Sequence, residues 1–103
     1  MIHTLSTGVI IGASLFRNNG HLTFDELHKV ASTIMKFNPD CYIDISRDAV
    51  IAEASFNKSL FKLSNSEVCL SDNSQNTLNR AKALCYDILD NNIRSAIDAA
   101  LKV

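Results

Sequence analysis

Residues 49–63 read AVIAEASFNKSLFKL, and the architecture depends on whether this stretch forms strands or helices. In residues 50–56 every second residue is apolar, which is the period of a β-strand. Asn57-Lys58 then interrupts the pattern before a second apolar run at residues 60–64. The pattern therefore predicts two short strands joined by a turn.

The neighbouring segments extend this prediction. Short apolar runs at residues 41–46 and 67–70 are separated from the central strands by breaks of only a few residues, which favours antiparallel hairpins. Residues 5–16 place larger side chains on one alternating face and mostly small ones on the other, so we predict a fifth strand there. Gly8 and Gly12 within it indicate a bend or a close approach of another segment.

Two helical segments accompany the strands. Thr23 and Glu26 have the spacing of a capping box, in which each residue satisfies a free backbone N–H at a helix start. The apolar spacing predicts a helix over residues 24–37, which Asn38-Pro39 ends because the residue before a proline is pushed out of the α region.

The last third of the chain, residues 74–103, also has helical apolar spacing. Asp90-Asn91-Asn92 could divide it into two helices, because these side chains compete for backbone hydrogen bonds. The apolar stripe stays in phase across this point, and we therefore predict one long helix, with two helices as the alternative.

These elements predict one α+β domain over residues 1–103. The order is β-α-β-β-β-β-α, as a mostly antiparallel five-stranded sheet with the helices packed on one face, which buries both helical stripes. This order is similar to that of the TATA-box-binding fold and, more loosely, of helix-grip folds. The likeness concerns topology alone and implies no function.

Composition excludes several classes of function. The chain has 103 residues and a net charge of −1, so no charge excess would drive binding to a nucleic acid or another polyanion. No run approaches the roughly 18 apolar residues of a membrane span. Three cysteines, Cys41, Cys69 and Cys85, do not form the dense, even pattern of a secreted disulfide scaffold, and we expect reduced thiols in a cytoplasmic protein.

No pattern typical of catalysis or of a metal site is present. The chain lacks a glycine-rich phosphate loop, and His3, His21 and His28 do not have the spacing of a zinc pair. None of the cysteines has a local signature of a nucleophile. We therefore predict a non-enzymatic protein with no catalytic residue, no cofactor and no metal.

The leading functional prediction is a small regulatory module, a protein–protein adaptor or inhibitor that acts through a sheet face or edge. Apolar side chains lie on both alternating faces of the predicted strands, whereas two helices can cover only one side of the sheet. An uncovered apolar patch is typical of an interface, and a homodimer is its simplest form. The predicted interface residues are Ile10, Phe16, Ile51 and Phe61.

Two alternatives remain open. Residues 48–63 resemble the helix-turn-helix of bacterial transcription regulators, which would place Arg47, Lys58 and Lys62 toward DNA phosphates. The sequence departs from that pattern, since the turn comes early and contains no glycine. The other alternative is a small-ligand pocket between the sheet and the C-terminal helix.

Overall fold

The computed structural model describes residues 2–103. Most of these residues form helices, and short strands form two small sheets. Strands β1 and β3 pair in parallel, and β2, β5 and β4 form an antiparallel sheet in that order. The α+β class is thus confirmed, but the predicted five-stranded sheet is wrong, and the likeness to the TATA-box-binding fold is lost with it. The elements in chain order are β1 (His3–Leu5), α1 (Thr7–Arg17), β2 (His21–Thr23), α2 (Phe24–Phe37), β3 (Cys41–Ile43), α3 (Arg47–Phe56), β4 (Phe61–Ser64), β5 (Glu67–Leu70), α4 (Gln75–Ala81), the π-helical turn η1 (Lys82–Tyr86) and α5 (Asn91–Leu101).

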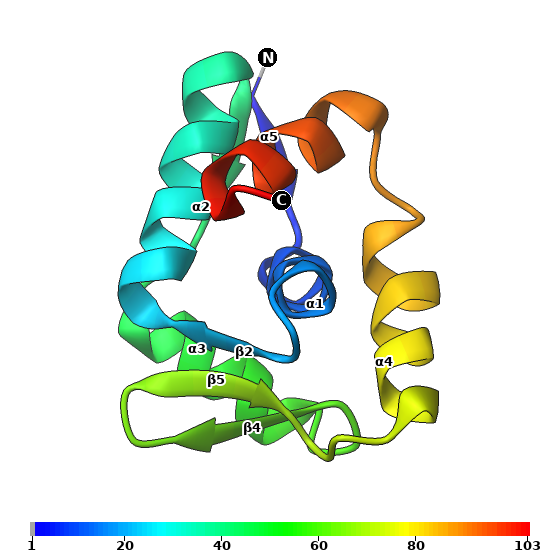
Figure 1. Ribbon diagram of the computed structural model, residues 1–103. Coiled ribbons are helices and arrows are strands. Elements are labelled where there is room, and N and C mark those ends of the chain that lie inside the picture. The colour runs from blue at the N-terminus through cyan, green and yellow to red at the C-terminus, as the bar shows by residue number, and fades with distance from the viewer. Residues whose placement is uncertain (1) are drawn as a thin grey trace.

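Helix α1 lies at the centre of the molecule. Figure 1 views it nearly end-on, with α2, α4, α5 and the β4–β5 hairpin arranged around it. Residues 10–15 of α1 are all buried. The hydroxyl of Ser14, the one polar side chain among them, donates a hydrogen bond of 2.7 Å to the carbonyl of Ile10. The buried Ser14 hydroxyl therefore has a hydrogen-bond partner.

The strand predicted over residues 5–16 is wrong, because most of this segment forms α1. A continuous apolar run cannot be assigned to strand or helix by periodicity alone, and a run of 10 to 12 residues or more favours a helix. A helix that is apolar on all sides lies in a core. Because it has no polar face, its sequence does not show the helical repeat of 3.6 residues. Ser6 caps the helix by accepting a hydrogen bond from the N–H of Val9 at 3.4 Å.

The strand predicted over residues 50–56 is also wrong, because this segment lies within α3. Alanine is the strongest helix former and is depleted in strands, and the segment contains Ala52 and Ala54. Ser46 caps the helix by accepting a hydrogen bond from the N–H of Ala49 at 3.3 Å. Only Val50 and Ala54, one helical turn apart, are buried in α3.

The helix-turn-helix expected as an alternative over residues 48–63 is not formed. Its first helix corresponds to α3, but residues 57–60 turn and the chain continues as strand β4 rather than as a recognition helix. The first half of this stretch is therefore a helix, and the second half is a strand. The strand predicted over residues 60–64 is thus confirmed. A one-residue difference at the start of β4 is within the usual uncertainty of boundaries.

Several predictions are confirmed. Helix α2 spans the predicted residues, and its capping box is formed, with the Thr23 hydroxyl accepting from the N–H of Glu26 at 3.0 Å and the Glu26 carboxylate accepting from the N–H of Thr23 at 2.9 Å. Strand β5 spans residues 67–70, and it pairs with β4 as an antiparallel hairpin. Asn65 occupies the hairpin turn at φ 56°, a conformation that asparagine tolerates.

The single long helix predicted over residues 74–103 is wrong. Helix α4 continues into the π-helical turn η1, and a new helix, α5, starts after Asp90, whose backbone is extended. The break covers residues 87–90 and ends at the Asp90-Asn91-Asn92 sequence, where the alternative prediction divided this segment into two helices. Asp98 of α5 then joins the parts, since it accepts hydrogen bonds of 2.9 Å from both Arg17 of α1 and the hydroxyl of Tyr86 in η1.

Gly12 permits the closest approach in the core. A Cβ atom at this position would lie 2.2 Å from the sulfur of Cys85 and 2.9 Å from its Cβ, so only glycine lets η1 pack against α1 at this depth. Gly8, one helical turn earlier, faces only the flexible carboxylate of Glu53, with Oε2 at 2.6 Å from a built Cβ. A side chain added at Gly8 could displace the end of the Glu53 side chain, whereas one added at Gly12 would collide with Cys85 in the core.

We predict that Gly12→Ala lowers the free energy of unfolding by about 1–3 kcal/mol, because overpacking a close-packed core costs that much. In the control Gly8→Ala the carboxylate can swing aside, and helix propensity gains up to about 1 kcal/mol, so stability should stay the same or rise slightly. Urea unfolding followed by circular dichroism measures both. Equal stability of Gly12→Ala and the unaltered protein would contradict the account of this contact.

The turn before α4 is held by Asp72. Its carboxylate accepts hydrogen bonds from the N–H of Ser74 at 2.8 Å and from the hydroxyl of Thr77 at 2.7 Å. Hydrogen bonds from Ser74 and Thr77 lower the pKa of Asp72 to about 2. Because the pKa is depressed in the folded state, the stabilisation is present above the unfolded-state pKa near 4 and is lost as the pH falls toward 2.

We predict that Asp72→Ala lowers the urea midpoint at neutral pH and that the difference from the unaltered protein closes between about pH 4 and pH 2. Asp72→Asn keeps an acceptor oxygen and should lose less stability, with less dependence on pH. Urea titrations at several pH values provide the measurement. A constant difference across this range would show that the carboxylate is not the stabilising group.

Candidate functional site

The four predicted interface residues are separated by the structure. Ile10 and Phe61 lie in the core, with exposed fractions of 0% and 2%, so they are not available to a partner in this conformation. Phe16 is half-buried and packs against Tyr86, with ring centroids 5.2 Å apart. Ile51 is exposed, on α3. The helical state of α1 and α3 separates Ile10, Phe16 and Ile51, since it moves every second residue away from the face that alternation predicts, whereas Phe61 is the buried first residue of β4.

The solvent side of α3 is unusually apolar. Apart from Arg47 at the start of the helix, its exposed residues recur at helical spacing and form what we call the α3 outer face, consisting of Asp48, Ile51, Ala52, Ser55 and Phe56. Phe56 has an exposed fraction of 94%, so almost none of its ring contacts the protein. Sequence reasoning missed Phe56 because a strand assignment placed it with Val50 and Ala54 on one buried face.

A groove lies beside the α3 outer face, between α3 and β4. It is an open hollow of about 370 Å³. Its apolar lining, which we call the floor of the groove, consists of Ala54, Phe61 and Leu63, and Lys58 and Lys62 line it as well. We call this feature the α3–β4 groove.

The α3–β4 groove and the α3 outer face are continuous, because Ser55 belongs to both. Leu63 adds apolar surface, with an exposed fraction of 39% on the hairpin side. The small side chains of Ala52 and Ser55 would let a partner's backbone approach α3 closely. Together the two features form one apolar surface with two ammonium groups at its edge.

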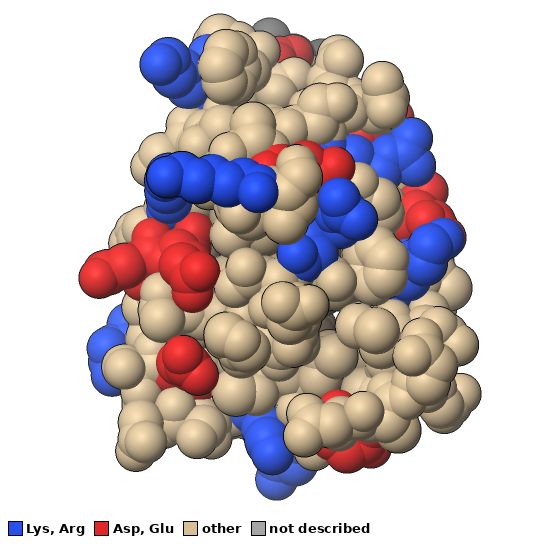
Figure 2. Space-filling model, viewed as in Figure 1, with Lys and Arg blue, Asp and Glu red and all other residues tan. Residues whose placement is uncertain are grey.

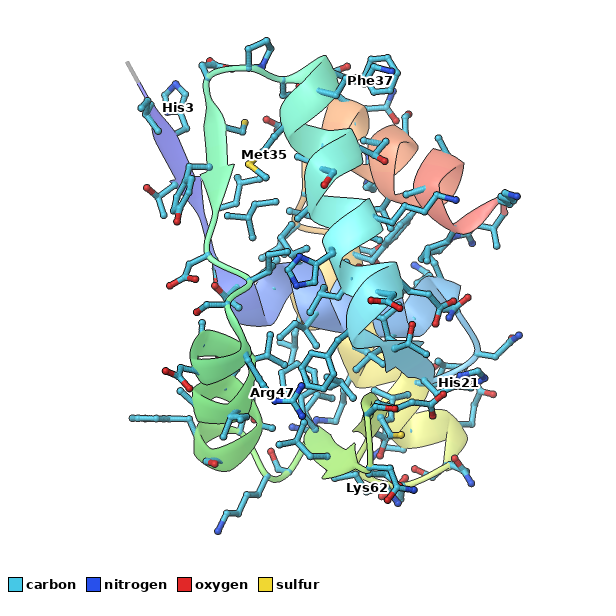
Figure 3. The ribbon with its side chains drawn as sticks, turned by 90° about the vertical axis from the view of Figure 1, so that its left-hand side faces the viewer. His3, His21, Met35, Phe37, Arg47 and Lys62 are labelled. Atoms are coloured by element: carbon cyan, nitrogen blue, oxygen red, sulfur yellow. The ribbon has the colours of Figure 1, made fainter. Side chains whose placement is uncertain are left out.

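The cations expected to face DNA are distributed differently. Lys58 and Lys62 meet at the α3–β4 groove, whereas the guanidinium of Arg47 lies over the ring of Phe24, 4.7 Å from its centroid. Figure 3 shows Arg47 beside α3 and Lys62 at the lower end of the molecule. On the face seen in Figure 2, acidic and basic side chains are interspersed around a broad uncharged area. Neither arrangement makes the strongly basic surface typical of DNA-binding domains.

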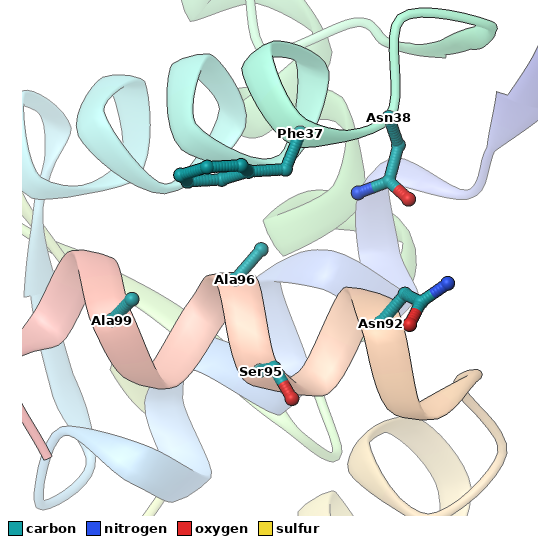
Figure 4. Close-up of a pocket in the computed structure, with 6 residues that line it drawn as sticks. All are labelled: Phe37, Asn38, Asn92, Ser95, Ala96 and Ala99. Atoms are coloured by element: carbon teal, nitrogen blue, oxygen red, sulfur yellow. The ribbon is translucent and has the colours of Figure 1, made fainter.

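Other hollows lie at the opposite end of the molecule. One, of about 370 Å³, lies between the end of α2 and α5, with Phe37 opposite Ala96 and Ala99 and with Asn38 opposite Asn92 (Figure 4). Next to it lies a hollow of about 420 Å³ lined by residues that include His3, Asp40 and Cys41. This second hollow lies between the β1–β3 sheet and the start of α5, which matches the position predicted for a ligand pocket, whereas the α2–α5 hollow lies between two helices.

Metal and nucleophile chemistry have little support in the described part of the chain. Within residues 2–103, no three His, Cys, Asp or Glu side chains converge as metal ligands. The three histidines are exposed; the nearest carboxylates to His3 and His21 are Asp40 at 3.8 Å and Glu67 at 3.9 Å.

All three thiols are less acidic than a free cysteine. Burial raises the pKa of Cys85 to about 11. Burial, with the neighbouring Asp40 and Asp90 carboxylates, raises the pKa of Cys41, and burial with Glu67 raises that of Cys69. A catalytic cysteine needs the opposite shift, because the thiolate is the nucleophile.

Comparisons with known proteins provide no functional assignment: no family model matches the chain, and neither a curated protein nor a solved structure matches it significantly. None of the helices formed by residues 2–103 is long and apolar enough to cross a membrane.

We predict that iodoacetamide at about pH 7.5 leaves Cys85 unmodified in the folded protein and alkylates Cys41 and Cys69 more slowly than a cysteine in an unfolded peptide. Peptide mapping by mass spectrometry measures the three rates, and urea should restore fast modification of Cys85. A thiol that reacts faster in the folded protein than in the peptide would indicate an activated nucleophile.

Proposed function

We propose that this protein is a non-enzymatic binding module that docks another protein on the α3 outer face and the adjoining α3–β4 groove. The observation that carries the proposal is the exposure of Phe56, which projects into solvent from the last turn of α3 with 94% of its surface accessible. Single exposed apolar residues are common, but contiguous apolar patches are typical of interaction sites. Here Phe56 belongs to a helical face that also exposes Ile51 and Ala52.

Aromatic side chains near the centre of an interface contribute much of the binding energy. Burial of an exposed phenylalanine side chain contributes about 1.5–3 kcal/mol from the area removed from water. Phe56 has little of its own surface buried within the fold, so a partner would gain nearly all of this contribution. The proposed surface thus replaces the sheet face or edge expected from the sequence with a helix face and a groove.

Nucleic-acid binding is less well supported. The guanidinium of Arg47 lies over the Phe24 ring, only Lys58 and Lys62 of the described lysine and arginine residues line the groove, and Asp48 lies on the α3 outer face itself. Neutralising a DNA backbone normally requires several more lysine or arginine contacts. An apolar groove floor also provides no donor to a base edge or a phosphate.

We expect Phe56→Ser to weaken partner binding while leaving the fold intact, because the ring packs against little of the protein. Proteins captured from a lysate of the source cells by the unaltered protein are identified, and the strongest candidate is purified for calorimetry. Its affinity should fall about tenfold or more with Phe56→Ser, as loss of a buried aromatic ring requires.

Phe37→Ser is the matched control, since Phe37 is also exposed, at 66%, and lies at the opposite end of the molecule from Lys62 (Figure 3). This variant should bind the partner like the unaltered protein. The proposal fails if the purified partner binds Phe56→Ser as tightly as the unaltered protein, or if only Phe37→Ser loses binding. Sedimentation of the same variants shows whether the partner is a second copy of this chain.

A further inference from the structure

The α3–β4 groove combines apolar and positive surface in a way that restricts what it can bind. Its floor consists of Ala54, Phe61 and Leu63, and the side chains of Lys58 and Lys62 line it as well. Among the described residues 2–103, no carboxylate lines the groove. A partner could insert an apolar side chain into this groove. The residues around that side chain would then lie close to the ammonium groups of Lys58 and Lys62.

The two lysines have no ionic partner within the fold. Among residues 2–103, neither Lys58 nor Lys62 lies within 4.0 Å of a carboxylate oxygen. Of the carboxylates nearest to them in sequence, Glu53 lies against Gly8 of α1, and Glu67 lies 3.9 Å from His21.

Arg80 adds positive charge behind the groove. Its guanidinium donates to the backbone carbonyl of Ser59 at 3.2 Å and to the Ser59 hydroxyl at 3.3 Å. Because Ser59 follows Lys58 in the chain, these bonds hold Arg80 close to Lys58. Ser71, which also lines the groove, donates to the same carbonyl at 2.8 Å. The rim of the groove is therefore a fixed turn that carries cations, in a chain whose net charge is −1.

We propose that the segment docked here is acidic and amphipathic: a stretch of a partner protein that inserts an apolar side chain into the α3–β4 groove and sets aspartate or glutamate side chains against Lys58 and Lys62. This inference rests on the proposed docking function and names the chemistry of the partner. Charge complementarity selects the acidic segment, because a basic one would meet two unpaired ammonium groups. The apolar floor and Phe56 favour a peptide over a nucleic acid, whose phosphates would gain nothing from them.

A peptide selection tests this inference with a defined probe. A random library of displayed peptides of about 12 residues is selected on the immobilised protein, and the most enriched peptides are synthesised and measured by fluorescence polarisation. We expect at least two acidic and two large apolar residues in each. Affinity should fall when sodium chloride rises from about 50 to about 300 mM, because exposed ion pairs are screened.

Three variants separate the contributions. Lys58→Glu/Lys62→Glu should weaken these peptides about fivefold or more, as expected for reversing two exposed pairs. Lys29→Glu/Lys36→Glu, on the exposed surface of α2, changes the net charge equally and should have little effect. Phe56→Ser should also weaken binding, since it removes the apolar anchor. Circular dichroism confirms that each variant is folded.

Each other outcome overturns a defined part of the account. Peptides that need Phe56 but are neutral or basic, and that ignore Lys58→Glu/Lys62→Glu, leave the docking surface in place and refute the acidic partner. Failure to enrich any peptide that depends on Phe56 or the two lysines refutes both. A DNA duplex of about 20 base pairs that binds as tightly as the peptides, and loses affinity in Lys58→Glu/Lys62→Glu, would assign the groove to nucleic acid instead.

Discussion

Helix α1 has no solvent-facing side over residues 10–15, and the arrangement of the other elements follows from this burial. An element that is apolar all round must be covered on every side, which needs several partners rather than one sheet. Helices α2, α4 and α5 and the hairpin supply that cover (Figure 1). Gly12 makes it close-packed, because the missing side chain is the space that Cys85 of η1 occupies.

The parts of the fold that could be predicted are those with local chemical signals. Three such signals act through neighbouring backbone groups, and all three are found. They are the capping box of Thr23 and Glu26, the end of the helix at Asn38-Pro39 and the short turn at Asn65-Ser66. Their effect does not depend on what packs against them. This is why α2 and the β4–β5 hairpin were placed correctly.

The parts that could not be predicted are those whose identity depends on burial. In α1, apolar and small residues follow one another without a polar face, and such a run fits a buried strand and a buried helix equally well in its periodicity. In residues 50–56, the alternation of apolar residues favours a strand, whereas the alanine content favours the helix that is formed. The candidate site changed for the same reason: Phe56 could be recognised as exposed only once Val50 and Ala54 were known to share the inner side of a helix.

The fold and the proposed surface are linked through α3. The helix needs only Val50 and Ala54 to attach it to the core, so its other positions are free to carry Ile51, Ser55 and Phe56 toward solvent. A surface of this kind is possible because stability comes from α1 and its neighbours rather than from α3. Variation on the outer face of α3 should therefore change binding more than folding.

Native-state hydrogen exchange of the backbone amides, followed by NMR, tests the central role of α1 most directly. The account predicts that the hydrogen-bonded amides of residues 10–15 exchange only through global unfolding, with an opening free energy equal to that measured by urea, and that amides of α3 exchange through smaller openings. Exchange of the α1 amides at an opening free energy no higher than that of α3 would show that α1 is not the structural centre of the molecule.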